Sequence, residues 1–489
     1  MDFRIVIHIL SLIGGVVAAS MFLPALWAWF DGTPDFKALA GSALFSLCLC
    51  VLFFWMSRGK KREARREQND FGVREAFAIV SFSWVVASFI GALPYVLYGT
   101  VTNFTDGFFE AMSGFTTTGA SILTDIESNP RGILLWRALT HWLGGMGIIV
   151  LGLAVMPLIG AGAIELYKAE VPTPIPEKLT PRLHQTAVIL WELYFFLTAL
   201  ETVALMLCGM DFFDGLTHAF ATLATGGFST YNKSIAHFNS PAIEWVITLF
   251  TFLAGVNFTL HYLFLRGRLD AYIKDDEFRF YLWLTLGATL VLTVSAVLHS
   301  VGGGLGGILR HAAFQVVSIL TTTGFAVTDT EQWPVFCHFV LLLLMFVGGC
   351  AGSTSGGIKV LRVMMLLRSA KKDMMQTLQP HRVLCVRVNG KPIKNEIISS
   401  VLAFFVLFML IYGAIVLFMT MLDIDLVSSL SGVLACLSNV GPGLADFGPV
   451  NNYYGVPASG KWVLSFAMLV GRLEIMTVLL LFVPRTWRR

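Results

Sequence analysis

Four short segments rich in threonine and glycine recur along the chain, and their backbone is suited to binding a dehydrated monovalent cation. Each segment carries one glycine near its centre, and glycine permits the backbone angles that turn successive carbonyl groups the same way. Four such segments meeting at one axis would present rings of carbonyl oxygens that replace the hydration shell of the ion. The candidate ion-binding residues, registered on one glycine per segment, are Thr117, Thr118 and Gly119; Ala224, Thr225 and Gly226; Thr322, Thr323 and Gly324; and Asn439, Val440 and Gly441.

We call these four threonine- and glycine-rich segments tetrads. A short apolar segment precedes each tetrad and is too short to cross a bilayer. Such a segment is typical of a re-entrant half-helix, whose partially negative C-terminal end would face the path of the ion. Unwound backbone at membrane depth is tolerated only where it is buried in protein or lines a wet cavity. One Thr-Thr-Gly sequence alone is more typical of an ordinary helix end, but four together favour a pore. The four segments are Asp106–Phe115, Asp214–Leu223, Ile308–Leu320 and Val427–Leu437.

The composition of the 489 residues requires a membrane around these segments. Apolar residues make up 56% of the chain and charged residues only 13%, against roughly 25% charged residues in a soluble domain. This composition excludes a soluble fold and predicts an all-α integral membrane protein. At about 20 residues per crossing, it predicts ten transmembrane helices with four re-entrant pore half-helices between them. The predicted spans cover residues 4–29, 37–57, 73–98, 133–158, 184–210, 241–265, 280–300, 335–358, 397–423 and 462–484.

The basic residues are distributed unevenly between the two sides of this topology. Ten crossings place both termini on one side, and most of the 34 Lys and Arg residues fall on that side. Cytoplasmic loops carry the excess of basic residues in membrane proteins. The sequence therefore predicts a multi-pass protein with both termini in the cytoplasm. The basic stretches 58–66 and 359–394 would contact lipid headgroups or dock a regulatory partner.

The pattern of long span, half-helix, tetrad and second span occurs four times. Internal repetition of this kind predicts four pseudo-symmetric units around one pore. Residues 1–70 would form two extra N-terminal spans and a basic cytoplasmic loop. The predicted repeats are 71–182, 183–278, 279–395 with an intramembrane loop at 348–357, and 396–489.

Five motifs resemble those of the Trk/Ktr/HKT superfamily of potassium transporters, and the resemblance covers nearly the whole chain. They are Ser113-Gly-Phe-Thr-Thr-Thr-Gly-Ala-Ser121, Ala224-Thr-Gly-Gly-Phe-Ser229, Thr321-Thr-Thr-Gly-Phe325, Ser438-Asn-Val-Gly-Pro-Gly443 and Gly471-Arg-Leu-Glu474. With the two extra spans and the chain length, they are similar to the TrkH branch rather than the shorter KtrB branch. The resemblance implies a potassium-translocating subunit of the bacterial inner membrane, usually homodimeric. It also implies a cytosolic, nucleotide-binding, TrkA-like regulatory partner.

One departure from tetrameric potassium channels concerns the residue after each tetrad glycine. Those channels carry a second filter glycine, whereas this chain has Ala120, Gly227, Phe325 and Pro442 at the four positions. The carbonyl ring should therefore be regular at the glycines and irregular beyond them. We expect fewer well-formed ion sites and weaker discrimination of potassium from rubidium or sodium.

A glycine-rich stretch interrupts the second span of the third repeat. Five glycines cost about 1 kcal/mol each relative to alanine in a helix, so the helix should break within the membrane. A loop there would lie on the cytoplasmic side of the tetrads and act as a gate, as the Trk resemblance also implies. The alternative is a small-residue face for close helix packing. The candidate gating residues of this loop are Gly348, Gly349, Gly352, Ser353, Gly356 and Gly357.

Arg472 is a further gating candidate because it lies inside the last predicted span, where a charge costs at least about 2.5 kcal/mol. It would either form a structural ion pair or act as a barrier to cations. At about 6 Å and an effective dielectric of 20, it would oppose a potassium ion by roughly 3 kcal/mol. Glu192 and Glu201 also interrupt a span. Proton relay and helix contact both stay open for these two carboxylates.

The sequence offers little for other chemistry. The seven cysteines lack a C-x-x-C pair and the ten histidines lack metal-binding spacings, so we predict buried free thiols and no catalytic metal. Gly302–Gly307 and Gly352–Gly357 mimic nucleotide-binding motifs, but no strand precedes the first and Lys359 is one position late in the second. We therefore predict no organic cofactor, no nucleotide site and no nucleic-acid partner, with potassium as the transported ion.

These features favour channel-like potassium uptake driven by the membrane potential. A potential of about 150 mV, negative inside, supports roughly 300-fold accumulation of a monovalent cation. A sodium- or proton-coupled potassium symporter is the first alternative. A polytopic membrane enzyme is the second, and it would need convergent carboxylates or histidines near one bilayer face. The sequence does not offer such a cluster, so we predict a transporter and no enzyme.

Overall fold

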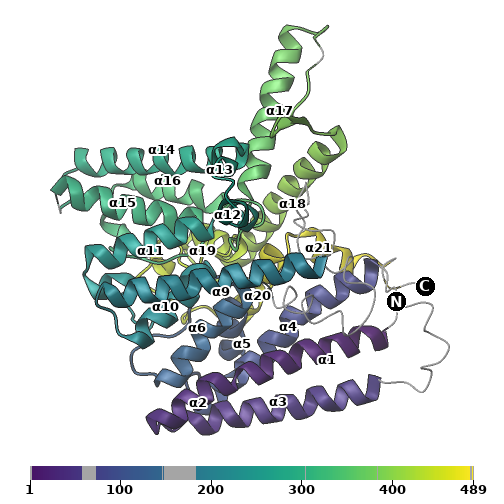
Figure 1. Ribbon diagram of the computed structural model, residues 1–489, viewed down its shortest axis with the longest axis vertical. Helices are drawn as coiled ribbons and strands as arrows, with labels where there is room; N and C mark the ends of the chain where they lie inside the picture. The colour runs from purple at the N-terminus through teal and green to yellow at the C-terminus, as the bar shows by residue number, and fades with distance from the viewer. Residues whose placement is uncertain are drawn as a thin grey trace.

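The computed structural model shows a bundle of helices in which the first described helix begins, and the last described helical turn ends, toward one side (Figure 1). It describes residues 3–57, 73–145, 147, 183–302, 304–382, 384–484 and 487. Within these ranges the one sheet is a hairpin of two antiparallel strands, β1 (Arg387–Val388) and β2 (Lys391–Pro392). The predicted helical architecture is confirmed in its main features. The predicted basic stretch 58–66 and the end of the 133–158 span lie outside the described residues.

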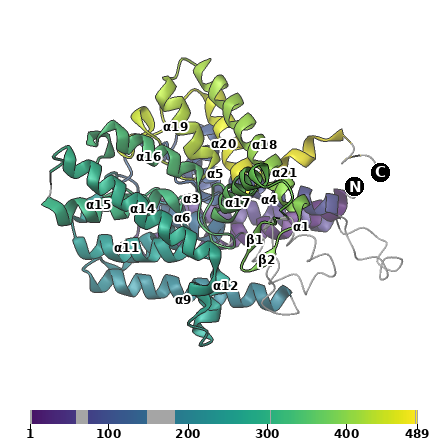
Figure 2. The same cartoon turned by 90° about the horizontal axis from the view of Figure 1, so that it is seen from above.

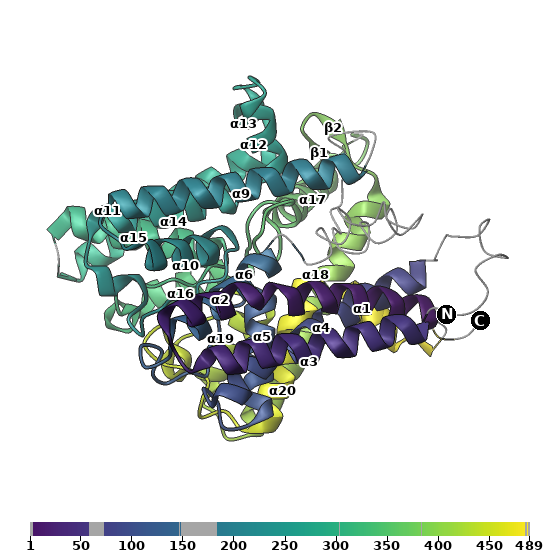
Figure 3. The ribbon, with the colours of Figure 1, turned by 60° about the horizontal axis from the view of Figure 1, so that its bottom comes forward.

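Three N-terminal helices form one edge of the molecule: α1 (Phe3–Ser20), α2 (Phe22–Asp31) and α3 (Asp35–Ser57). α1 packs against both α3 and α4 (Val73–Tyr98), so these helices lie side by side (Figure 3). Gly32 ends α2 in the left-handed region, with φ of 67°, and the chain then turns back into α3. The buried carboxylate of Asp35 accepts a hydrogen bond from the backbone N–H of Ile133 at 3.2 Å. This bond ties the N-terminal layer to the rest of the bundle.

After α3, the order of long helix, short helix and further helix occurs four times in the described residues. We call these four sets units one to four. The short helices end at Phe115, Leu223, Leu320 and Leu437, as the sequence predicts. The helices of the four units are α4, α5 (Phe104–Phe115) and α6 (Arg131–Gly145); α9 (Leu183–Leu207), α10 (Phe212–Leu223) and α11 (Pro241–Ala254); α14 (Asp276–Leu298), α15 (Gly304–Leu320) and α16 (Val335–Phe346); and α18 (Asn395–Thr420), α19 (Leu426–Leu437) and α20 (Ala458–Arg472).

Six helices or continuous helix pairs of the described residues are long and apolar enough to cross a membrane, and eight are if each sharply bent pair is one span. Two predicted straight spans are wrong in shape. The 241–265 span is broken into α11 and α12 (Phe258–Leu265), which meet at 100°. The 462–484 span is broken after α20 by 113°, and α21 (Met476–Leu479) and η5 (Leu480–Phe482) follow.

Local contacts explain both breaks. At the first, Gly255 packs so closely on Tyr281 and Thr321 that a side chain would overlap them, and the Asn257 side chain accepts from Thr259 N at 2.8 Å to start α12. At the second, residues 474 and 475 adopt φ of 55° and 60°. A left-handed pair of non-glycine residues cannot continue a helix. Tertiary contacts therefore override apolar patterns that are typical of straight spans.

The segment after α16 leaves the bundle. α17 (Val360–Leu378) runs across the direction of the neighbouring helices and projects from the body (Figure 1), and the β1–β2 hairpin lies beside it (Figure 2). α12 and α13 (Ala271–Lys274) form a second projection (Figure 3). Short 3-10 turns complete the described elements: η2 (Ser234–Phe238), η3 (Thr330–Gln332) and η4 (Ala445–Phe447).

All seven cysteines are free thiols, as predicted. Four of them are buried and Cys208 is half-buried. Cys48 and Cys385 are exposed, which corrects the expectation of burial for these two. Cys48 faces outward because α3 lies at the edge of the bundle, and Cys385 lies in the projecting segment.

Polar side chains cap the N-termini of three short helices. Asn103 accepts from Asp106 N at 2.8 Å, Asp211 accepts from Asp214 N at 2.8 Å, and Asp425 accepts from the backbone of α19. Such caps satisfy backbone donors that the first helical turn leaves without partners. The starts of these helices are thus encoded locally, next to the apolar runs that follow.

The cap at Asp425 gives a stability prediction. Its exposed carboxylate accepts from Val427 N at 2.9 Å and Ser428 N at 3.2 Å. We expect Asp425→Ala to lower the free energy of unfolding by about 1 kcal/mol, because the first turn of α19 loses its cap. Thermal unfolding of the purified protein in detergent measures the change. Asp425→Asn keeps an acceptor and should retain nearly the original midpoint; equal losses in both variants would contradict a capping role.

Candidate ion pathway

The four short helices end in the same backbone motif. The second residue after each short helix has a left-handed backbone: Thr117, Thr225, Thr322 and Asn439 have φ of 50°, 53°, 59° and 58°. The N–H of the next residue donates to the carbonyl five residues earlier at 2.8–2.9 Å in all four units. This is the Schellman arrangement, which satisfies carbonyls that the last helical turn leaves open. The chain therefore leaves each short helix in the same direction relative to its own axis.

A left-handed glycine follows in each unit and corrects the predicted register of the second tetrad. Gly119, Gly227, Gly324 and Gly441 have φ of 80°, 79°, 79° and 96°. The equivalent of Gly119 is thus Gly227, and the choice of Gly226 was wrong by one residue. Backbone hydrogen bonds fix the register. Gly226 N donates to Ala221 O at 2.8 Å, and in the other three units the residue that makes this bond is the one directly before the left-handed glycine. The sequence-based register took the first of two adjacent glycines, and the sequence alone does not show which of them is left-handed.

These four glycines, which we call the glycine ring, meet around a common axis. A side chain on Gly119 would overlap the carbonyl of Gly226, and one on Gly227 would overlap that of Thr323. The pattern continues from Gly324 to the carbonyl of Val440 and from Gly441 to that of Thr118. In each step a glycine approaches the carbonyl that precedes the next glycine. The tetrads of units one to four therefore follow one another around a closed ring.

Side chains behind the tetrads form a hydrogen-bonded collar. Thr116 and Thr118 join their hydroxyls at 2.7 Å, and Thr321 and Thr323 do so at 2.8 Å. The Asn439 amide donates to Thr118 Oγ1 at 2.9 Å, which links unit four to unit one. All five side chains are buried. These threonine hydroxyls thus support the backbone of the tetrads by bonding to one another.

A buried ion pair that sequence reasoning missed holds the chain after the first two tetrads. Arg137 Nε lies 2.6 Å from Glu110 Oε1, and both side chains are almost fully buried. Glu110 also accepts from Ile122 N at 2.9 Å, while Arg137 donates to Ser229 O at 2.9 Å. The guanidinium lies 3.5 Å from the centre of the Phe228 ring. An arginine within the apolar run of α6 was the available signal, but its partner lies 27 residues away.

A cavity of about 210 Å³ opens at the glycine ring. Residues from all four units line it, including Gly119, Gly227, Gly324 and the residue after the fourth ring glycine, Pro442. Polar groups of Ser121 and Asn232 also contribute to its wall. An ion at this position would meet backbone and hydroxyl oxygens before it reaches the ring.

The glycine-rich stretch forms a loop, as predicted. α16 ends at Phe346, α17 starts at Val360, and a bridge between Val347 and Ile358 closes the base of the loop. Gly352 and Gly357 adopt φ of 74° and 64°. The helix of the predicted span 335–358 therefore ends at Phe346, just before the predicted break. Five glycines favour unwinding here over a straight packing face.

The loop lies directly against the tetrads. Thr354 Oγ1 donates to Leu223 O, at the end of the second short helix, at 2.9 Å. Gly356 N donates to Thr322 Oγ1 at 2.7 Å, and a side chain on Gly356 would lie 2.5 Å from Ser438 O. Gly348, Gly349, Gly356 and Gly357 are buried, Gly352 is exposed and Ser353 is half-buried. The loop therefore contacts units two, three and four on the helix side of the ring.

Arg472 links the loop to unit one. Its guanidinium donates to Thr117 Oγ1 at 3.0 Å and to Thr354 O at 2.8 Å. It also donates to the carbonyls of Gly144 and Gly145 at 2.8 and 3.0 Å. Hydrogen bonds to backbone oxygens stabilise this intramembrane charge. Arg472 and the loop together lie beside all four tetrads.

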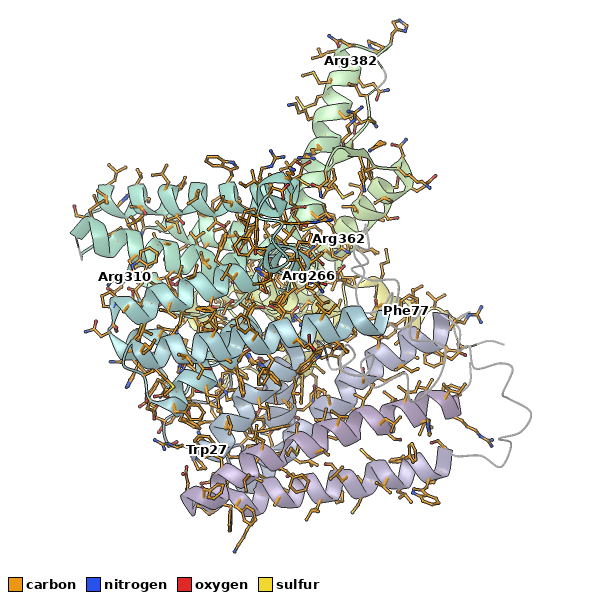
Figure 4. All side chains as sticks on the ribbon, viewed as in Figure 1. Trp27, Phe77, Arg266, Arg310, Arg362 and Arg382 are labelled. Carbon is orange, nitrogen blue, oxygen red and sulfur yellow. The ribbon has the colours of Figure 1, made fainter. Side chains whose placement is uncertain are left out.

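Glu474 lies two residues after Arg472 but pairs with another arginine. Its carboxylate forms a buried ion pair with Arg362 of α17, which Figure 4 places near the base of that helix. The pair joins the break after α20 to the chain that follows the loop. Glu192 is exposed whereas Glu201 is fully buried, so these two carboxylates do not share one environment.

Glu277 clamps both ends of the loop and gives a second prediction. Its buried carboxylate accepts from Ala351 N at 2.6 Å and from Leu361 N at 3.1 Å. Each net hydrogen bond contributes about 1 kcal/mol, a factor of about five, so we expect Glu277→Ala, which removes both, to loosen the loop and raise ion flux at least fivefold. Flux into proteoliposomes measures this. Glu277→Gln retains an acceptor and should change flux less; a lower flux in a well-folded Glu277→Ala protein would contradict the clamp.

No group of three or more His, Cys, Asp and Glu side chains suited to a metal ion occurs among the described residues. The oxygen-rich ring differs from such a centre because its ligands would be backbone carbonyls, which suit weakly held alkali ions. The geometry of this region thus suits transit of an ion rather than its permanent binding.

Comparison with known proteins relates this architecture to one family. Residues 47–489 match the family model described as TrkH, cation transport protein. The chain is 36% identical to the Trk system potassium uptake protein TrkH of Escherichia coli K12 and 38% identical to that of Halomonas elongata, each over 100% of both chains. The crystal structure of the potassium transporter TrkH from Vibrio parahaemolyticus superposes with a TM-score of 0.88 at 34% identity, again over 100% of both chains. The chain therefore belongs to the TrkH family of membrane cation transporters.

Proposed function

We propose that this protein is a channel-like potassium uptake pore whose selectivity filter is the glycine ring. The observation that carries the proposal is the closed sequence of contacts from Gly119 through Gly227 and Gly324 to Gly441. Backbone carbonyls at such a constriction replace the hydration shell of an alkali ion. The relatives in Escherichia coli and Halomonas elongata are named potassium uptake proteins, which favours potassium as the ion.

The gate in this proposal is the loop at 348–357, together with Arg472. The loop contacts units two, three and four beside the glycine ring, and Arg472 contacts Thr117 of unit one. An ion leaving the ring would meet the positive guanidinium and the buried loop, so both would have to move or yield for conduction. The hydrogen bonds that hold the loop, such as the one from Ala351 N to Glu277, set the stability of the closed state.

We further propose ten crossings with both termini in the cytoplasm of a bacterial inner membrane. α1 begins and α21 ends toward one side of the bundle (Figure 1), whereas Arg310 lies toward the opposite end (Figure 4). The four units would be pseudo-symmetric repeats around the pore. A homodimer and a cytosolic, nucleotide-binding, TrkA-like subunit complete the proposal; relatives named as Trk system proteins support a multisubunit assembly.

A flux measurement tests the proposed function. Purified protein in proteoliposomes should take up potassium when a potential, negative inside, is imposed without any other ion gradient. The reversal potential should follow the potassium gradient alone and stay constant when the sodium or proton gradient changes. A shift with either of those gradients would instead favour a coupled symporter. Absence of potassium flux from folded protein under both conditions would reject the proposal.

A further inference from the structure

The second tetrad differs from the other three at one buried position. The residue before the ring glycine is Thr118 in unit one, Thr323 in unit three and Val440 in unit four, and all three are fully buried. In unit two the corresponding residue is Gly226. Unit two therefore lacks a side chain where the other units have a β-branched one.

Position 226 has no room for a side chain, and this explains the glycine, because the backbone conformation there does not require glycine. Gly226 is absent from the positive-φ glycines of the structure, unlike Gly227 beside it. A Cβ atom on Gly226 would overlap the imidazole of His141 and would lie 2.5 Å from its Cγ atom. The imidazole thus occupies the volume that the threonine or valine side chain fills elsewhere.

Packing alone holds His141 in this position within the described residues. The side chain comes from α6 of unit one, is fully buried, and lies 4.0 Å from the Phe228 ring, centre to centre. Neither ring nitrogen has a hydrogen-bond partner among the residues that the structure describes. Burying a polar ring without hydrogen bonds is costly. The shape of the imidazole is therefore the property that the fold uses here.

The contact reaches the ring in one further step. The carbonyl of Gly226 is the group that Gly119 approaches, with its carbon 3.3 Å from the position of a Cβ on Gly119. If the space behind Gly226 were emptied, this backbone would be free to relax away from Gly119. The separation between units one and two would then increase, whereas the hydrogen bond from Asn439 to Thr118 would still join units four and one.

We propose that His141 is a positioning residue that sets the width of the glycine ring on the side of unit two. It would thereby determine how well the pore distinguishes potassium from the smaller sodium ion. The inference rests on the proposed filter function and adds a residue outside the tetrads to it. In unit two, the side chain behind the backbone is therefore His141 of unit one and does not come from the tetrad itself.

A double-mutant cycle of three variants and the original protein tests this role through the permeability ratio of sodium to potassium, measured from reversal potentials in proteoliposomes. We expect His141→Ala to raise that ratio about fivefold, because a wider ring fits the potassium ion less well. Gly226→Thr should lose most flux or fail to fold, since the new side chain overlaps the imidazole. The double variant His141→Ala/Gly226→Thr should recover flux and the original ratio, because unit two then resembles units one and three.

Two controls separate the possible failures. Leu139→Ala removes a buried side chain from the same helix and should leave the ratio unchanged. Gly119→Ser alters the ring directly; an unchanged ratio there would reject the proposed filter itself. A changed ratio in Gly119→Ser with an unchanged ratio in His141→Ala would reject only the positioning role. A double variant no better than Gly226→Thr would also overturn that role.

Discussion

Substitution Gly324→Ala is expected to reduce potassium flux about 100-fold or more. Gly324 has φ of 79°, and a Cβ there would overlap the carbonyl of Val440 and lie 2.6 Å from Pro442 Cδ. Both groups belong to the neighbouring unit, so the ring cannot accommodate a methyl group without opening. The left-handed backbone adds roughly 1–2 kcal/mol of strain for any residue with a side chain. Potassium uptake into proteoliposomes measures the effect.

The matched control for Gly324→Ala is Gly307→Ala in the same unit. Gly307 lies within α15, and a Cβ there would meet open space. Alanine also has a higher helix propensity than glycine, so this protein should fold and transport normally. Both proteins should first elute as single species from size exclusion. Normal potassium flux and selectivity in a well-folded Gly324→Ala protein would show that the ring is not the filter.

The second large effect is expected from Arg472→Ala, which should increase potassium current about tenfold or more. Removal of the guanidinium eliminates an electrostatic barrier of roughly 3 kcal/mol for an ion at about 6 Å. It also removes the hydrogen bonds that join the loop at Thr354 to unit one at Thr117. Both changes favour conduction. Current through the reconstituted protein at fixed potential is the measurement.

Arg472→Lys separates the charge from the hydrogen bonds. Lysine keeps the positive charge but lacks the planar fork that reaches several acceptors at once. Current near the original level in Arg472→Lys, with high current in Arg472→Ala, would assign the effect to charge. Equally high current in both variants would assign it to release of the loop. Unchanged current in a folded Arg472→Ala protein would contradict a gating role in either form.

The features encoded locally were predictable from the sequence. The short helices end where apolar runs meet threonine and glycine, and the unwound loop at 348–357 follows from the density of glycines. Both are consequences of backbone propensity. The breaks in the spans 241–265 and 462–484 were missed because they depend on tertiary contacts at Gly255 and on a left-handed pair at 474–475.

The partners of the buried charges could not be predicted either, because they also depend on tertiary contacts. Arg137 and Glu110 are 27 residues apart, and Arg362 and Glu474 are 112 apart. One sequence does not reveal such pairings, although each charge within an apolar run signals that a partner is needed. The register at the adjacent pair Gly226 and Gly227 was wrong for another reason: the two glycines differ in backbone conformation and in the imidazole beside one of them.

The glycine ring is assembled from four unequal stretches of a single polypeptide. In a pore built from four identical subunits, any substitution is copied fourfold, and its consequences multiply. Here a mutation alters one quarter alone while three others keep their chemistry. If the ring is the filter, as proposed, ion preference can change during evolution by small, separately selectable steps, and each quarter can acquire its own support.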